Sequence, residues 1–95
     1  MDYFVYILFS EKLKKYYTGQ TQNLPDRIRR HNRGQETFTS KGVPWELVFC
    51  TQVNSRPEAL KLEKKIKNFR SQQRLQNFIE QEVMNGRGSR KIENL

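Results

Sequence analysis

Two stretches near the start of the chain, Tyr3–Phe9 (YFVYILF) and Lys15–Gln20 (KYYTGQ), set its architecture. Both are rich in aromatic and β-branched residues, which favour strands. The polar link between them is short, which predicts an antiparallel hairpin. Side chains alternate along a strand, so Val5 and Ile7 share one face of the first strand and Tyr6 lies on the other. Because both faces carry bulky apolar residues, we expect this strand to be buried on both sides.

Capping residues indicate the elements that follow the hairpin. Asn23, Ser55 and Ser71 are of the types that accept a hydrogen bond from the first turn of a helix. Gly34 suits the end of the first of these helices. The alternation of WELVFCTQV over Trp45–Val53 predicts a third strand. We therefore expect a helix to about Arg33, a loop over residues 35–44, the strand, and two helices that end at about Arg70 and Met84.

The order strand–strand–helix–strand–helix–helix predicts an α+β fold, in which helices flank a small three-stranded antiparallel sheet. The length of 95 residues allows one domain, which we expect to span residues 1–84. Residues 85–95 contain GRGSRK and are expected to form a basic, flexible tail. A single cysteine, Cys50, and a single histidine exclude an internal disulfide and a zinc site built from Cys and His.

The chain is strongly basic, with 18 Lys and Arg against 10 Asp and Glu and a formal net charge of +8. Such an excess favours nucleic acid as the partner. A membrane partner is not expected, because the longest apolar run is far too short to span a bilayer. No signal peptide is evident and Cys50 is unpaired, so we expect a cytoplasmic protein. The cations expected to contact nucleic acid are Arg29, Arg30, Arg33, Lys41, Lys67 and Arg70.

The first predicted helix carries an unusual pair of polar residues. By the helical spacing rule, Arg27 and His31 lie one turn apart on the same face as the apolar residues Leu24 and Ile28. Charged residues are seldom buried without a partner, which makes the pair a candidate for chemistry. The structural alternative is that Arg27 extends along the edge of the core and His31 is an ordinary boundary residue.

Tyrosines and one glutamate add further candidates. Only one of Tyr16 and Tyr17 can share a strand face with Tyr6, because adjacent residues point in opposite directions. These tyrosines are also explained as core aromatics with hydroxyls at the rim. Glu63 flanks the apolar stripe of the second predicted helix, where a simple ion pair with Lys67 would also account for it.

Taken in order, these residues resemble the GIY-YIG nuclease superfamily, most closely its short stand-alone bacterial members. Phe4-Val5-Tyr6 stands at the GIY position, and Tyr17-Thr18-Gly19 stands at the YIG position. Arg27 and His31 match the arginine and the histidine or tyrosine of the first helix. Glu63 matches the metal-binding glutamate of the second. Each motif is short, but their order along the expected elements is a specific signal.

The resemblance implies a Mg²⁺-dependent (or Mn²⁺-dependent) endonuclease, a hydrolase that cuts phosphodiester bonds in DNA. Structure-directed or weakly specific cutting, in DNA repair or processing, is expected. Its implied catalytic residues are Tyr6, Tyr17, Arg27, His31 and Glu63, with the metal held by Glu63. We expect Arg27 to bind the scissile phosphate. Tyr17 or His31 is expected to take the proton of the attacking water, with Tyr6 orienting that water.

Two other functions remain open at this point. Gln20 stands where excision-repair relatives carry a lysine after YIG, and Phe4 replaces the glycine of GIY. The net charge of +8 and the change at Gln20 would support a non-catalytic nucleic-acid-binding module on the same fold. A small interaction domain with a coincidental motif would bind no nucleic acid at all. The sequence leaves open the shape of the substrate, the choice between DNA and RNA, and the oligomeric state.

Overall fold

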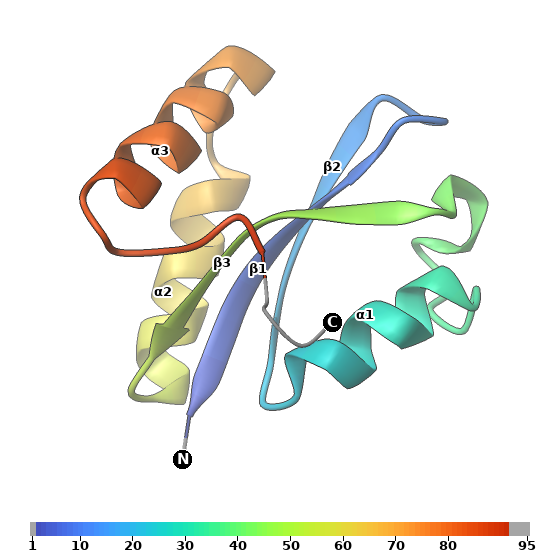
Figure 1. Cartoon of the computed structure of the whole chain (residues 1–95), viewed down its shortest axis with the longest axis horizontal. Helices are drawn as coiled ribbons and strands as arrows, with labels where there is room; N and C mark the ends of the chain where they lie inside the picture. Colours follow the sequence, from blue (N-terminus) through green and yellow to red (C-terminus); the bar gives the residue numbers. More distant parts are fainter. Residues whose placement is uncertain (1, 92–95) are drawn as a thin grey trace.

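Helices cover both faces of a three-stranded antiparallel sheet (Figure 1). The structure is a computed structural model that describes residues 2–91. It confirms the predicted α+β class and the predicted order of elements. The elements are β1 (Tyr3–Ser10), β2 (Lys15–Thr21), α1 (Leu24–Asn32), the short 3₁₀ helix η1 (Ser40–Gly42), β3 (Trp45–Val53), α2 (Arg56–Lys67) and α3 (Gln72–Met84).

The strand order β2-β1-β3 makes β1 the central strand. Tyr6 lies opposite Gly19 of β2, and Leu8 lies opposite Tyr17. Directly paired residues share a face of the sheet, so Tyr17 lies on the same face as Tyr6. Tyr16 lies on the other face. The register therefore determines that Tyr17, and not Tyr16, shares a face of the sheet with Tyr6.

Each face of the sheet has its own core. On one face, Val5 and Ile7 pack with residues of α2 and α3. On the other, Tyr6 and Leu8 pack against α1, whose Leu24 and Ile28 are almost fully buried. Burying such a side chain contributes about 1.5–3 kcal/mol. This second core fixes α1, which carries Arg27 and His31, over the tyrosine face. The remaining buried residues of the two cores are Phe49, Ala59, Ile66, Leu75 and Ile79 on the first face and Trp45 and Cys50 on the second.

The predicted caps are confirmed at all three helices. Asn23 accepts a hydrogen bond from the backbone of Asp26, Ser55 from that of Glu58, and Ser71 from that of Arg74. Helix α2 ends at Lys67, three residues before the predicted end at Arg70. The reason is local, because Ser71 must be extended to act as the next cap and the chain therefore leaves the helix before it.

The segment after α3 differs from the expected free tail as far as the structure describes it. The Cys50 N–H donates to the Ser89 carbonyl at 2.8 Å, and the Ser89 N–H donates back at 2.9 Å. Strand β3 is an edge strand, and an edge has unpaired backbone groups that can bind another segment. The expectation for residues 92–95 lies outside the described residues.

Candidate active site

A chain of hydrogen bonds runs beneath α1. The Tyr6 hydroxyl lies 2.9 Å from Nε2 of His31, and Nδ1 of His31 lies 2.7 Å from Oγ1 of Thr39. The Thr39 hydroxyl donates to the Glu36 carbonyl at 3.3 Å, which leaves its oxygen to accept from Nδ1–H. Nε2 then accepts from the Tyr6 hydroxyl. Tyr6, His31 and Thr39 are each at most 1% exposed, so solvent does not compete for these bonds.

Burial sets the protonation of these groups. It raises the pKa of Tyr6 well above its ordinary value, and the Arg27 guanidinium opposes this rise only in part. The pKa of Tyr17 is also raised, again mainly by burial and against the effect of Arg27. Burial lowers the pKa of His31, although the Glu36 carboxylate acts in the opposite direction. At neutral pH both phenols are therefore protonated and the imidazole is neutral.

Two residues of β2 complete the tyrosine cluster. The ring centroid of Tyr17 lies 5.1 Å from that of His31 and 6.4 Å from that of Tyr6. A Cβ atom on Gly19 would lie 2.5 Å from the Tyr6 hydroxyl oxygen, so only glycine lets the phenol lie across β2. Tyr17 is half-buried, whereas Tyr6 and His31 are fully buried. Tyr17 is therefore the ring of this cluster that a substrate can reach.

Arg27 also reaches the solvent, and an acidic residue lies beside it. Its Nε lies 3.9 Å from Oε1 of Glu36, and Nε of Arg30 lies 3.4 Å from the same oxygen. The Arg27 side chain keeps a third of its surface exposed, so it remains accessible from solvent. Sequence reasoning missed Glu36, because it lies in a loop whose residues follow no periodic pattern.

Glu63 lies on α2, which packs on the opposite face of the sheet from Tyr6. Its carboxylate lies 3.5 Å from Nζ of Lys67, as the simple ion-pair explanation expects. It also raises the pKa of Tyr17, so its charge acts at that phenol. Glu63 is thus the ion-pair partner of Lys67, and its charge also acts at Tyr17. The structure brings Tyr6, Tyr17, Arg27 and His31 into one cluster, whereas it shows no direct contact between Glu63 and that cluster among the described residues.

Glu63 offers one carboxylate, a hard oxygen donor, to a metal ion. Among residues 2–91 no group of three or more His, Cys, Asp or Glu side chains could enclose a metal. Mg²⁺ does not need such a cage, because it keeps several waters and binds through one or two carboxylates together with substrate phosphates. The Glu63 side chain retains 18% of its surface, and its Oε1 is paired with Lys67.

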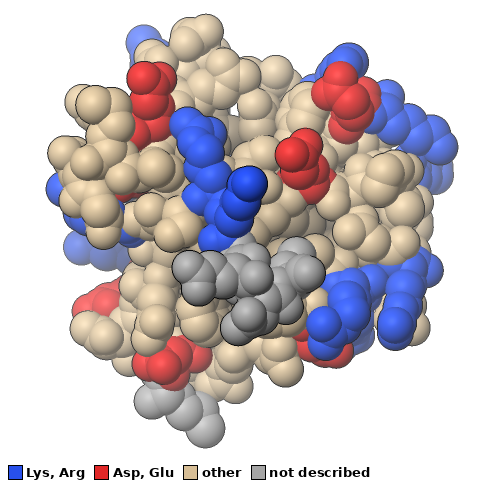
Figure 2. Space-filling view, viewed as in Figure 1, with Lys and Arg blue, Asp and Glu red and all other residues tan. Residues whose placement is uncertain are grey.

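The predicted phosphate contacts lie in three places. Arg29, Arg30 and Arg33 lie exposed on or beside α1, and basic side chains gather over the region of α1 at the lower right of Figure 2. Lys41 is exposed on η1. Lys67 and Arg70 line a groove of about 420 Å³ together with Tyr16, Tyr17 and Thr18. Tyr17 therefore belongs both to this groove and to the tyrosine cluster.

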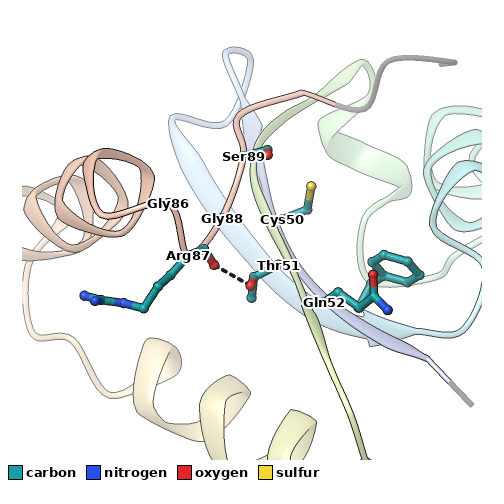
Figure 3. Close-up of a pocket in the computed structure, with 8 residues that line it drawn as sticks. Cys50, Thr51, Gln52, Gly86, Arg87, Gly88 and Ser89 are labelled. Atoms are coloured by element: carbon teal, nitrogen blue, oxygen red, sulfur yellow. Dashed lines mark hydrogen bonds between the residues drawn. The ribbon is translucent and has the colours of Figure 1, made fainter.

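A hollow of about 600 Å³ lies at the opposite edge of the sheet, between β3 and the C-terminal segment (Figure 3). Burial raises the pKa of the Cys50 thiol in its wall, which keeps that sulfur protonated and unreactive. The Arg87 side chain points away from Cys50 and pairs with Glu82. This hollow contains none of the predicted site residues and no reactive group, so it is a poor candidate for catalysis.

The geometry agrees with a comparison to known protein families. The model of the GIY-YIG catalytic domain matches residues 2–77. The chain belongs to the GIY-YIG family. This confirms the resemblance predicted from the sequence, and it makes the chain a member of a nuclease superfamily whose substrates are nucleic acids. Across residues 2–91, no helix is long and apolar enough to cross a membrane.

Several GIY-YIG relatives have nearly the same size. A UPF0213 protein of Staphylococcus haemolyticus (strain JCSC1435) is 38% identical over 74 residues, which cover 77% of this chain and 89% of the relative. A UPF0213 protein of Staphylococcus aureus is 35% identical over 75 residues, or 78% and 90% of the two chains. The solution NMR structure of a UPF0213 protein from Bacillus halodurans has a TM-score of 0.54 and 28% identity, and the match covers 84% of each chain.

The departures of this GIY-YIG domain from the motif can be placed on the sheet. Thr18 and Gln20 alternate with Tyr17 and Gly19 along β2, so they lie on the opposite face of the sheet from the tyrosine cluster. The replacement of isoleucine by Thr18 therefore leaves the Tyr6 face unchanged. Phe4 packs at the border of the core that contains Tyr6, where a larger residue than glycine is accommodated.

Proposed function

We propose that this protein is a metal-dependent endonuclease that hydrolyses phosphodiester bonds in DNA, with structure-directed or weak sequence specificity, in DNA repair or processing. One observation carries the proposal: the buried Tyr6–His31–Thr39 chain lies against a reachable phenol, Tyr17, and a reachable guanidinium, Arg27. A pure binding domain has no need of a neutral, hydrogen-bonded imidazole beneath its surface. The unpaired Cys50 suits a cytoplasmic location.

Charge stabilisation is the role of Arg27. Hydrolysis of a phosphodiester builds negative charge on the phosphoryl oxygens, and preformed N–H donors stabilise it. Arg27 offers a planar fork that binds two phosphate oxygens at once. It lies on α1, which the second core and the Asn23 cap hold in place, so the donors are positioned before the substrate arrives.

Proton transfer from the attacking water is assigned to Tyr17. The sequence leaves this role open between Tyr17 and His31, and geometry favours Tyr17, because both ring nitrogens of His31 are already bonded and its ring is buried. The pKa of Tyr17 is raised in the free protein, so cations must lower it in the complex. Arg27 already acts in that direction.

Glu63 is the residue that would hold Mg²⁺ or Mn²⁺. When bound there, the ion would supply a second positive charge at the scissile phosphate. The buried pair Tyr6 and His31 is assigned to positioning, since it fixes the rings against which Tyr17 and Arg27 pack. The exposed cations contact phosphates rather than base edges, which suits weak sequence specificity. They are Arg29, Arg30, Arg33, Lys41, Lys67 and Arg70.

The test is a cleavage panel of duplex, branched, flapped and single-stranded DNA and of RNA, with Mg²⁺, Mn²⁺ or a chelator. We expect metal-dependent cleavage of DNA by the wild type and by the control variant Glu80→Ala, which removes an exposed carboxylate on α3. Glu63→Ala should abolish cleavage and still bind DNA. If Glu63→Ala cuts as fast as the wild type, the metal assignment is wrong.

A second candidate function is a nucleic-acid-binding module without cleavage. The observation that favours it is the Glu36 carboxylate beside Arg27, which partly neutralises the residue assigned to the phosphate. The same panel separates the two functions. Salt-sensitive binding without any metal-dependent product would support the binding module and exclude the nuclease.

A further inference from the structure

Phe38 is an unusually exposed aromatic residue. Its side chain is 93% exposed, more than any other large hydrophobic residue that the structure describes. An aromatic ring normally gains free energy by leaving water, so a ring kept in solvent is unusual. It lies in the loop of residues 33–44, which joins α1 to β3.

The loop that carries Phe38 is anchored rather than loose. The neighbouring Thr39 is buried and bonded to His31, and its carbonyl accepts a hydrogen bond from Nε1 of Trp45 at 2.7 Å. The Ser10 hydroxyl donates to the Gly42 carbonyl at 2.7 Å. A ring held out from an anchored loop is preorganised, so it can make a contact without a large cost in ordering.

Phe38 is also adjacent to the candidate active site. Its Cα is about 3.8 Å from that of Thr39, which bonds directly to His31. Two residues earlier in the loop, Glu36 contacts Arg27. The loop that carries Phe38 therefore also contacts the two predicted site residues of α1, through Thr39 and Glu36.

The charges around the ring favour a nucleic acid as its contact. Arg33 and Lys41 are exposed in the same loop, and Arg30 is exposed on the adjoining helix. An aromatic ring among cations is the arrangement that binds single strands, where bases stack on the ring and phosphates meet the cations. A protein partner would need a contiguous apolar patch. The other exposed large apolar residues, Leu13, Leu60 and Met84, lie in the β1–β2 turn, α2 and α3.

We propose that Phe38 stacks on an unpaired base next to the scissile phosphate, and that the substrates are nucleic acids with unpaired bases at the cut, such as single strands and flaps. Bases inside a duplex are already stacked, so the ring gains a partner there only if the duplex is opened at a cost. The cleavage part of this inference rests on the proposed nuclease function, whereas the stacking part does not.

The first test is equilibrium binding without metal, which prevents cleavage. The probe is an oligonucleotide with a single 2-aminopurine, used as a single strand and as a blunt duplex. We expect Phe38→Ala to bind the single strand roughly tenfold to a hundredfold more weakly, with loss of the fluorescence change. Its affinity for the duplex should stay within about twofold of the wild type, since the cations are untouched.

Two variants serve as controls. Phe38→Trp keeps a ring that stacks, so it should retain wild-type affinity for the single strand. Met84→Ala removes another exposed apolar side chain, 77% exposed at the end of α3, and should change neither affinity. Because Phe38 is in solvent, its replacement should leave the folded state intact, which the thermal unfolding curve checks.

The second test is cleavage of a flap and of a matched duplex with Mg²⁺. Preferred cutting of the flap that Phe38→Ala reduces at least tenfold would support the inference. Wild-type protein that cuts nothing would overturn the nuclease function, while the binding arm would still decide the role of the ring. If Phe38→Ala lost equal affinity for the single strand and the duplex, or lost none, the stacking proposal would be wrong. A change only in self-association, measured by sedimentation, would also contradict it.

Discussion

The Tyr6 hydroxyl lies 2.9 Å from Nε2 of His31, although the two residues belong to β1 and α1 and are separated by 25 positions in the chain. Both side chains are fully buried, so this bond is made within the second core rather than at its rim. It ties the helix that carries Arg27 to the central strand. The same bond therefore contributes to the stability of the fold and to the geometry of the site.

The first prediction concerns Thr39, which accepts from the other nitrogen of His31. Thr39→Val keeps the shape of the side chain but leaves Nδ1–H buried without a partner. We expect a loss of about 1–3 kcal/mol in the free energy of unfolding, measured with urea. Cleavage should also slow, with kcat falling more than KM changes, because the rings beneath Tyr17 lose their fixed orientation.

Thr39→Ser is the matched control. It retains the hydroxyl and should keep most of the stability and activity of the wild type. Equal losses in the serine and valine variants would mean that the methyl group, and not the hydrogen bond to His31, accounts for the effect.

The second prediction concerns pH. Burial lowers the pKa of His31 in the folded protein below its ordinary value of about 6.5. As the pH falls through that ordinary value, the unfolded chain binds a proton that the folded chain does not, so the free energy of unfolding decreases. The loss accumulates until the pH reaches the lowered pKa of the folded state.

Urea unfolding at about pH 7.5 and about pH 5.5, in the wild type and in His31→Gln, measures this effect. The glutamine variant cannot take up the proton and should lose less stability on acidification than the wild type. A difference between the two proteins that stays constant over this range would contradict a lowered pKa.

The elements of the fold could be predicted because each has a local cause. Alternating side chains identify the strands, and Asn23, Ser55 and Ser71 mark the helix starts. The shared helix face of Arg27 and His31 could also be predicted, since residues four apart in a helix lie on the same face. The choice of Tyr17 over Tyr16 needed the register between β1 and β2, which no local pattern gives.

The contacts made by the loop of residues 33–44 and by the C-terminal segment could not be predicted, because they also depend on the tertiary structure. Glu36 and Thr39 belong to a segment without a periodic pattern, and their contacts with Arg27 and His31 form only when the loop packs against α1. The approach of Glu63 to Tyr17 depends on how α2 lies on the sheet. The pairing of Ser89 with β3 depends on a free strand edge, a property of the assembled sheet.

The third prediction concerns Gly19. Gly19→Ala would place a Cβ atom 2.5 Å from the Tyr6 hydroxyl oxygen and 2.7 Å from Cζ, within a buried and well-packed site. We expect a destabilisation of about 1–3 kcal/mol from this overpacking, together with a loss of activity as the phenol moves away from His31. Thermal unfolding and the cleavage assay measure the two effects.

A double-mutant cycle with Tyr6→Phe tests the cause. The phenylalanine removes the nearest clashing atom, so Gly19→Ala should cost less in that background than in the wild type. Additive losses would mean that the alanine acts elsewhere, for example on the backbone of β2.

The fourth prediction concerns Glu36, which lies beside both Arg27 and Arg30. Glu36→Gln removes the negative charge and frees both guanidinium groups for phosphate. Partly exposed ion pairs of this kind are worth up to about 1 kcal/mol, so we expect DNA to bind up to roughly fivefold more tightly. The slope of log K against log salt should steepen by about one, because more counterions are released on binding.

Glu46→Gln, on the exposed side of β3, is the matched control for the change in net charge. It should alter affinity less than Glu36→Gln, since its carboxylate contacts neither arginine of α1 in the described part of the chain. A cleavage assay of the Glu36→Gln variant distinguishes two roles for Glu36, competition with phosphate and metal binding. If the carboxylate only competes with phosphate for Arg27, the glutamine variant should cut at least as fast as the wild type. Tighter binding with loss of metal-dependent cleavage would instead make Glu36 a second ligand of the ion beside Glu63, and weaker binding would contradict the competition itself.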